Sequence, residues 1–198
     1  MHQHPNKEYK IFTIPINYED SWDEFSKESI NEHFNWFLSI KDIRLNLFCD
    51  FVFMDCPQCL DQANIGYIEH LFCNLVSVSF KTKEQLKIEI DKIALHLRPY
   101  AKPTKYKFDE RTISLCYDIA IFLGELIISL DSKIKWQMET DKRLADYGRP
   151  VLIKKGVKLR LNPFTVTRII ASKIYDKEYK SGEMESFFNY WKLCYEVT

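Results

Sequence analysis

One segment constrains this 198-residue chain more than any other: Ile113 to Leu130 is apolar almost all round. A surface helix carries a single apolar stripe, whereas a helix that is apolar on every side packs against several neighbours. The sequence therefore predicts a central buried helix. Arg111, Asp118 and Glu125 recur every seven residues and form one narrow polar seam along it. Because seven residues span about 10.5 Å of helix axis, we interpret the seam as a solvated or salt-bridged edge rather than a catalytic pair.

A glycine inside this helix needs a separate explanation. Gly124 lies directly before Glu125. Glycine in a helix interior costs about 1 kcal/mol relative to alanine. We therefore expect a neighbouring element to approach the helix closely at Gly124.

Helical periodicity also marks the first hundred residues. Ser21 to Glu24 fits a capping box, in which two side chains satisfy free amides at a helix start, so we expect a helix to begin there. Apolar stripes through residues 60–80 and, after a second capping box at Thr82 to Gln85, through residues 86–97 predict two successive helices. The segment Ile43 to Met54 is apolar and aromatic, and its pattern leaves both strand and helix open.

The periodicity changes to alternation after residue 130. Ile134 and Trp136 fit a short strand, and residues 150–161 fit a β-hairpin that turns around Lys155 and Gly156. Asn162 and Pro163 then suit the N-cap and first position of a helix over residues 164–174, and another helix is expected over residues 187–193. The predicted fold class is α+β, mainly helical, with a small antiparallel sheet.

Composition supports one domain over residues 1–198. Hydrophobic residues make up 46% of the chain and aromatic residues 15%, which is enough to build a sizeable core. Pro99 and Pro103 interrupt any helix in the segment 98–103. An alternative division places a helical subdomain at residues 1–98 and a helix-hairpin-helix subdomain at residues 104–198.

The ends and the cysteines indicate the compartment. The first residues lack the apolar core of a secretory signal, and no apolar run approaches the roughly 18 residues that a membrane span requires. We therefore expect a cytoplasmic protein without a membrane partner. In a reducing compartment the six cysteines are expected to be thiols or metal ligands.

The sharpest ligand pattern is Cys56, Cys59, His70 and Cys73, with the spacing C-x2-C-x10-H-x2-C. Paired cysteines two residues apart suit a tetrahedral zinc ion. However, a chain with a full apolar core does not need a metal to hold it together. We predict no metal and no cofactor, and an enzyme or metal-stabilised protein that uses the Cys56–Cys73 region is the alternative.

Two further readings of the sequence concern catalysis. The pair Cys56 and Cys59 also fits a thioredoxin-type redox motif, but that fold needs alternating strands and helices after the motif, and residues 60–97 read as successive helices. No G-x-S-x-G, phosphate-binding glycine loop or H-E-x-x-H motif occurs in the chain. The sequence therefore indicates no catalytic residues.

The formal net charge of zero hides an asymmetry. Residues 1–80 carry 12 acids and 5 bases, whereas residues 81–198 carry 16 acids and 23 bases. On the first helix the acids lie opposite the apolar stripe, and we take Asp23, Glu24 and Glu28 as candidate partner-binding residues.

The basic half of the chain suggests another possible function, that of an adaptor that binds nucleic acid. Lys154, Lys158 and Arg160 share the outer face of the predicted hairpin. A nucleic-acid surface also needs aromatic side chains for stacking, and only Tyr147 and Phe164 accompany these bases. We interpret the hairpin face as solvated and do not expect nucleic acid as a partner.

A resemblance adds to this reading. Four motifs carry it: Leu123-Gly124-Glu125, Trp136, Gly148-Arg149-Pro150-Val151-Leu152 and Leu161-Asn162-Pro163-Phe164. Together they resemble a module of poorly characterised bacterial proteins that include immunity proteins of polymorphic toxin systems. The resemblance covers about a third of the chain and carries over no functional residue. It implies a small cytoplasmic inhibitor, not an enzyme, that binds one cognate toxin; we expect the acidic first helix to steer a basic toxin.

Overall fold

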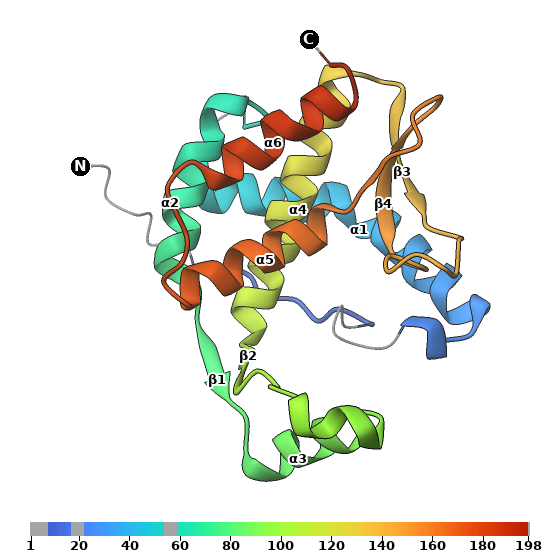
Figure 1. Cartoon of the computed structure of the whole chain (residues 1–198). Coiled ribbons are helices and arrows are strands. Elements are labelled where there is room, and N and C mark those ends of the chain that lie inside the picture. The colour runs from blue at the N-terminus through green and yellow to red at the C-terminus, as the bar shows by residue number, and fades with distance from the viewer. Residues whose placement is uncertain (1–7, 17–21, 54–58, 198) are drawn as a thin grey trace.

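The central helix predicted from the sequence is α4 (Glu110–Leu130), shown in yellow in Figure 1. The computed structural model describes residues 8–16, 22–53 and 59–197. Helices α1 (Lys27–Phe53), α2 (Ile65–Leu75), α5 (Pro163–Tyr175) and α6 (Glu183–Cys194) pack around α4. The fold is mainly helical α+β with two small antiparallel sheets, which confirms the predicted fold class.

Helix α4 corrects one expectation. By length and composition it is apolar enough to cross a membrane, so the chain does contain a run of that size. In this fold 72% of its most apolar window is buried inside the protein. Burial against α1, α5 and α6 is the behaviour of a core helix.

The first helix begins later than predicted. Residues Trp22–Glu24 form a short 3-10 turn, η1, and α1 starts at Lys27. Ser21, the predicted cap, lies outside the described residues. Residues 43–53, for which the pattern left strand and helix open, form the last part of α1, so the helix is 27 residues long.

Residues 60–108 differ from the predicted pair of successive helices. A short turn η2 (Gln62–Asn64) leads into α2, and β1 (Val78–Phe80) then separates α2 from α3 (Lys83–Asp91). The capping box at the start of α3 is confirmed, because Thr82 Oγ1 accepts from the Gln85 amide at 3.2 Å and the Gln85 side chain accepts from the Thr82 amide at 2.9 Å. Helix α3 ends at Asp91, and a 3-10 turn η3 (Leu95–Tyr100) follows.

A projecting arm results from this arrangement. Strand β2 (Tyr106–Phe108) returns antiparallel to β1, with Phe80 opposite Tyr106 and Val78 opposite Phe108. We call residues 79–107 the arm; it extends away from the helical core at the bottom of Figure 1. The segment 98–103, predicted as a helix-breaking boundary, lies at the end of η3 within this arm.

The second sheet contains β3 (Ile134–Met138), β4 (Pro150–Lys154) and β5 (Arg160–Leu161), in that order. The predicted turn is confirmed at Gly156, whose φ of +91° is a conformation that suits glycine. Strand β5 is shorter than predicted. Alternation also fails in β4, because the neighbours Val151 and Leu152 are both buried. Because successive side chains of a strand point to opposite faces, both faces of β4 are buried at these two residues.

Helix α5 begins as its sequence predicts. The side chain of Asn162 accepts a hydrogen bond from the Thr165 amide at 3.1 Å, and Pro163 occupies the first helical position. The core joins both halves of the chain: Phe48 of α1 and Phe122 of α4 belong to one buried cluster, with ring centroids 6.2 Å apart.

Candidate functional site

The solvent face of α1 is acidic. Glu28, Glu32, Asp42 and Asp50 are exposed and fall within about 80° of the helix circumference at 100° per residue. Two aliphatic side chains flank them, Leu38 with 39% and Ile43 with 60% of its surface exposed. We call these six residues the α1 acidic face: Glu28, Glu32, Leu38, Asp42, Ile43 and Asp50.

Of the residues predicted from sequence, Glu28 belongs to this face, whereas Glu24 precedes α1 in η1. Glu24 and Glu28 are exposed, and the side chain of Asp23 is outside the described part of the structure. Hydrogen bonds from the backbone and from the Ser26 hydroxyl hold the pKa of Glu28 below its usual value. A basic residue lies close to this end, because the Arg149 guanidinium is 5.7 Å from the ring of buried Trp22. Further along the helix, Asp42 is paired with neighbouring Lys41 at 2.6 Å. Glu32 and Asp50 are in no ion pair within the described part of the chain.

Sequence reasoning missed the larger part of this face. Leu38 is 39% exposed although it is apolar. Ile43 and Asp50 lie in the segment for which the pattern left strand and helix open, and Asp42 directly precedes that segment. The signal was present in the spacing: Glu28, Glu32, Asp42 and Asp50 share one side of a helix once residues 43–53 are taken as helical.

A buried ion pair fixes α1 on α4. Arg44 donates to Asp118 through Nε at 3.0 Å and through Nη2 at 2.6 Å. The hydroxyl of Tyr9 donates to the same carboxylate at 2.5 Å, and Arg44 Nη2 also donates to the carbonyl of Lys10 at 2.9 Å. Burial raises the pKa of Asp118, whereas the Arg44 and Tyr9 hydrogen bonds act in the opposite direction. This ion pair is fully inside the protein and serves structure.

Glu125, a second member of the predicted seam, is also salt-bridged. Lys41 of α1 lies 2.9 Å from Glu125 Oε1, and the Trp136 indole donates to the same oxygen at 2.9 Å. The two carboxylates of α4 thus face α1 rather than each other, which confirms the reading of the seam as a salt-bridged edge. Arg111, the third member, is half-buried at the start of the helix.

The cysteine pattern is not assembled as a zinc site would require. Cys59 forms a disulfide with Cys49 of α1, so its sulfur is not available as a thiolate ligand. This corrects the expectation that all cysteines are thiols or ligands. Cys73 and His70 are exposed on α2, and Cys56 lies outside the described residues. The disulfide also joins residues ten positions apart, whereas the cysteines of the thioredoxin motif are three positions apart.

A pocket of about 440 Å³ lies beside this disulfide. Three leucines contribute to its lining, and the carboxylate of Asp61 within it accepts from the Ala63 amide at 2.9 Å to cap η2. Seven residues line the pocket: Cys59, Leu60, Asp61, Gln62, Leu126, Ser129 and Leu130. The single carboxylate is committed to a helix cap, so the pocket offers no acid-base pair.

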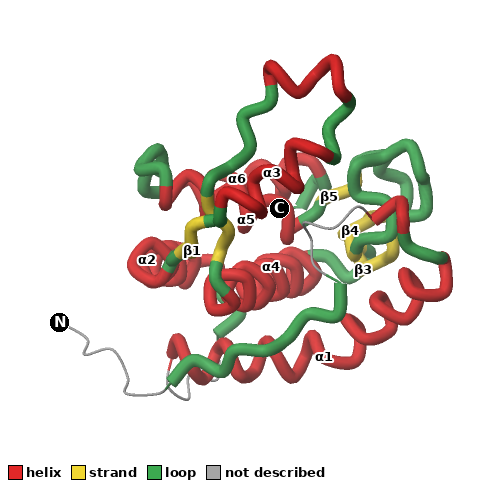
Figure 2. Tube along the Cα trace, turned by 90° about the horizontal axis from the view of Figure 1, so that it is seen from below, coloured by secondary structure: helices red, strands yellow, loops and turns green. Residues whose placement is uncertain are grey.

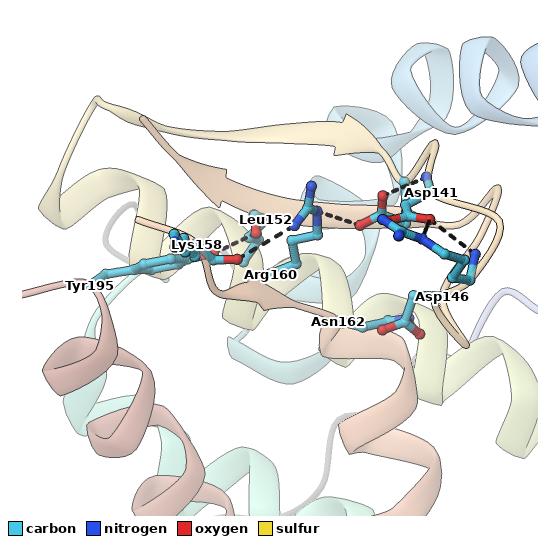
Figure 3. A network of polar contacts seen from close by, with 9 residues as sticks. Asp141, Asp146, Leu152, Lys158, Arg160, Asn162 and Tyr195 are labelled. Carbon is cyan, nitrogen blue, oxygen red and sulfur yellow. Dashed lines mark hydrogen bonds and ion pairs between the residues drawn. The ribbon is translucent and has the colours of Figure 1, made fainter. Parts of the chain in front are cut away.

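Two of the three bases predicted on the hairpin face, Lys154 and Arg160, are paired with acids; Figure 3 shows Arg160 with the polar contacts around it. Arg160 Nε lies 2.5 Å from buried Glu139, and Arg143 pairs with Asp141 at 2.7 Å. Lys154 pairs with Asp131 at 3.0 Å. A phosphate backbone would have to compete with these internal carboxylates, which weakens the case for a nucleic-acid surface here.

The motifs behind the resemblance form one packed unit. Gly124 lies so close to Trp136 that an added Cβ would be 2.1 Å from the indole Cζ2. Glu125 accepts from the indole nitrogen, and Phe164 packs against the same ring with centroids 5.7 Å apart. The predicted close approach at Gly124 is confirmed, and these motif residues have packing or hydrogen-bonding roles.

Comparison of the chain with family models, with curated proteins and with solved structures finds no match in any of the three. The resemblance to the immunity-protein module therefore stays a prediction.

Proposed function

We propose that this chain is an immunity-type binding protein that neutralises a cognate basic toxin through the α1 acidic face. The proposal is supported by the exposure of four carboxylates and two aliphatic side chains on one side of a single helix. Helix α1 has 27 residues and a length of about 40 Å. A rigid helix of this length offers a partner one continuous surface.

The chemistry of the face indicates how binding occurs. Exposed carboxylates attract a basic partner and raise its association rate, more so at low ionic strength. Ile43 supplies an apolar contact that a docked partner can remove from water. The Arg44–Asp118 pair holds the face rigidly on α4, so little conformational freedom is lost on binding. In the proposed complex the toxin is inhibited by coverage of its surface and no bond is made or broken.

Charge reversal tests the proposal. One variant replaces Asp23, Glu24 and Glu28 with lysine, and a second replaces Glu32, Asp42 and Asp50. A control with the same change in net charge reverses three exposed acids elsewhere, Glu8, Glu178 and Glu185. We expect association with the toxin encoded beside this gene to slow about tenfold or more in at least one face variant, and to depend less on salt.

The control should retain at least most of the wild-type rate, and Ile43→Ser should mainly raise the dissociation rate. Comparison of the two face variants locates the interface along α1. Unchanged association in both would contradict the proposed surface. Failure of the neighbouring toxin to bind at all would overturn the proposed function.

A further inference from the structure

The arm has no core of its own. Every residue from Ser79 to Lys107 is exposed or half-exposed, although the segment is rich in aliphatic side chains. Five large hydrophobic side chains on it are strongly exposed: Phe80, Ile88, Leu95, Leu97 and Tyr100. Exposed apolar side chains gathered on one projection and surrounded by charge mark an interaction site.

The arm is nevertheless held in a defined conformation. At its base the ring of Tyr106 lies 4.3 Å from that of Tyr175, and its hydroxyl donates to Asp176 at 3.3 Å. At its tip Arg98 donates to the Ile93 carbonyl at 2.9 Å and to the Asp91 carboxylate at 3.0 Å.

These tip contacts join the end of α3 to η3. They hold Leu95 and Tyr100 in positions where 78% and 81% of their surfaces are exposed to water. A preformed apolar tip loses little entropy when it docks.

The charge of the arm identifies its partner. Residues 79–107 contain eight bases and three acids, a net charge of +5, in a chain whose net charge is zero. Glu89 is paired with Lys81 at 2.8 Å and Asp91 with Arg98 at 3.0 Å. Six exposed lysines are left, none in an ion pair within the described part of the chain: Lys83, Lys87, Lys92, Lys102, Lys105 and Lys107.

The composition separates three classes of partner. Protein interfaces favour arginine and are poor in lysine, whereas seven of the eight bases of the arm are lysines. Nucleic-acid surfaces use aromatic stacking, whereas three of the five strongly exposed apolar side chains here are aliphatic: Ile88, Leu95 and Leu97. Lysines around exposed leucine and tyrosine are the combination that binds an anionic lipid surface, with the apolar groups at the acyl boundary and the cations among the headgroups.

We propose that the arm docks peripherally on an anionic phospholipid membrane, with Leu95, Leu97 and Tyr100 entering the interface. This surface binding requires no membrane span and revises the expectation from sequence that the chain has no membrane partner. It uses none of the residues of the α1 acidic face. In Figure 2 that helix runs along the lower edge while the arm reaches the upper edge, so the two surfaces lie on different sides of the protein.

Co-sedimentation of the full chain with vesicles tests the proposal. The wild-type protein should bind vesicles of phosphatidylglycerol with phosphatidylcholine, and binding should be lost at high salt and on phosphatidylcholine alone. The double variant Leu95→Ser with Tyr100→Ser should bind roughly tenfold more weakly. Its matched control is Leu193→Ser with Tyr190→Ser on α6, where the leucine is 77% exposed.

A charge variant completes the test. Lys102→Gln with Lys105→Gln should weaken vesicle binding by about thirtyfold, because each lysine near an anionic surface contributes about a factor of five. The control pair is Lys133→Gln with Lys135→Gln, on exposed positions directly before and within β3, which should leave binding unchanged. Circular dichroism of each variant shows whether it is folded.

Several results would overturn the proposal. Absence of binding to the anionic vesicles by the folded wild-type chain is the first, and equal loss in test and control variants is the second. Binding of a duplex DNA probe, without vesicle binding, would assign the arm to nucleic acid instead. Self-association that Leu95→Ser abolishes, again without vesicle binding, would assign it to a second copy of the chain.

Discussion

His33 is a buried titratable side chain that faces aromatic rings. It is 2% exposed, with the rings of Trp22 and Trp36 centred 4.9 and 5.1 Å away. Its Nε2 lies 3.4 Å from the Tyr117 hydroxyl, and its Nδ1 has no hydrogen-bond partner among the described residues. Burial lowers the pKa of His33 from 6.5 to about 4. The protonated form is therefore disfavoured in the folded protein.

This lowered pKa predicts how stability depends on pH. The unfolded chain takes up a proton at His33 below pH 6.5 and the folded chain does not, so stability falls as the pH drops from 6.5 to about 4. The full loss is about 3 kcal/mol. The free energy of unfolding, measured by urea denaturation across this pH range, should change less with pH in His33→Gln than in wild type. His70→Gln, a change at an exposed position, should show the same pH dependence as wild type. Equal slopes in all three proteins would contradict the prediction.

At the scale of elements, the close contact between α4 and β3 depends on glycine at position 124, which has no side chain. A Cβ at Gly124 would overlap the Trp136 ring, so Gly124→Ala must displace the indole from Glu125 and Phe164. Overpacking costs about 1–3 kcal/mol, against about 1 kcal/mol gained in helix propensity. We expect a net loss of up to about 2 kcal/mol in the free energy of unfolding.

A second glycine provides the control for this prediction. Gly66 on α2 has nothing within 4 Å of an added Cβ, so Gly66→Ala should stabilise by up to about 1 kcal/mol. In a Trp136→Leu background, Gly124→Ala should lose its penalty. A double-mutant cycle measured by chemical denaturation quantifies the coupling. A stabilising Gly124→Ala in the wild-type background would show that the contact is not tight.

The elements also show how far sequence reasoning reaches. Signals contained within a few residues, such as the caps at Thr82 and Asn162 and the turn at Gly156, were predictable because their hydrogen bonds are local. Strand β1 was not, since three residues carry no periodicity and its partner β2 lies at the other end of the arm in the sequence. The Cys49–Cys59 disulfide was not predicted, because a reducing compartment was expected and cysteines in such a compartment remain thiols or ligands. The candidate acidic face was found only at its first turn, because its remaining residues depend on the full length of α1.

At the scale of the whole molecule, the chain separates its charge into two surfaces. The α1 acidic face lies on a helix anchored to the core by a buried ion pair, whereas the basic arm is attached at the β1–β2 ladder and at Tyr106. An arm with no buried residue contributes little to the core. We therefore expect that the arm can be removed without disturbing the α1 acidic face.

Excision of the arm is the corresponding prediction. The Lys81 amide donates to the Lys105 carbonyl at 2.9 Å, so these residues can be joined by a two-residue Asn-Gly turn in place of residues 82–104. The shortened protein should unfold within about 1 kcal/mol of wild type, because no fully buried residue is removed and the closed loop is shorter. It should keep toxin association and lose vesicle binding. A loss of several kcal/mol in chemical denaturation would show that the arm belongs to the folding core, because only buried contacts could account for a difference of that size.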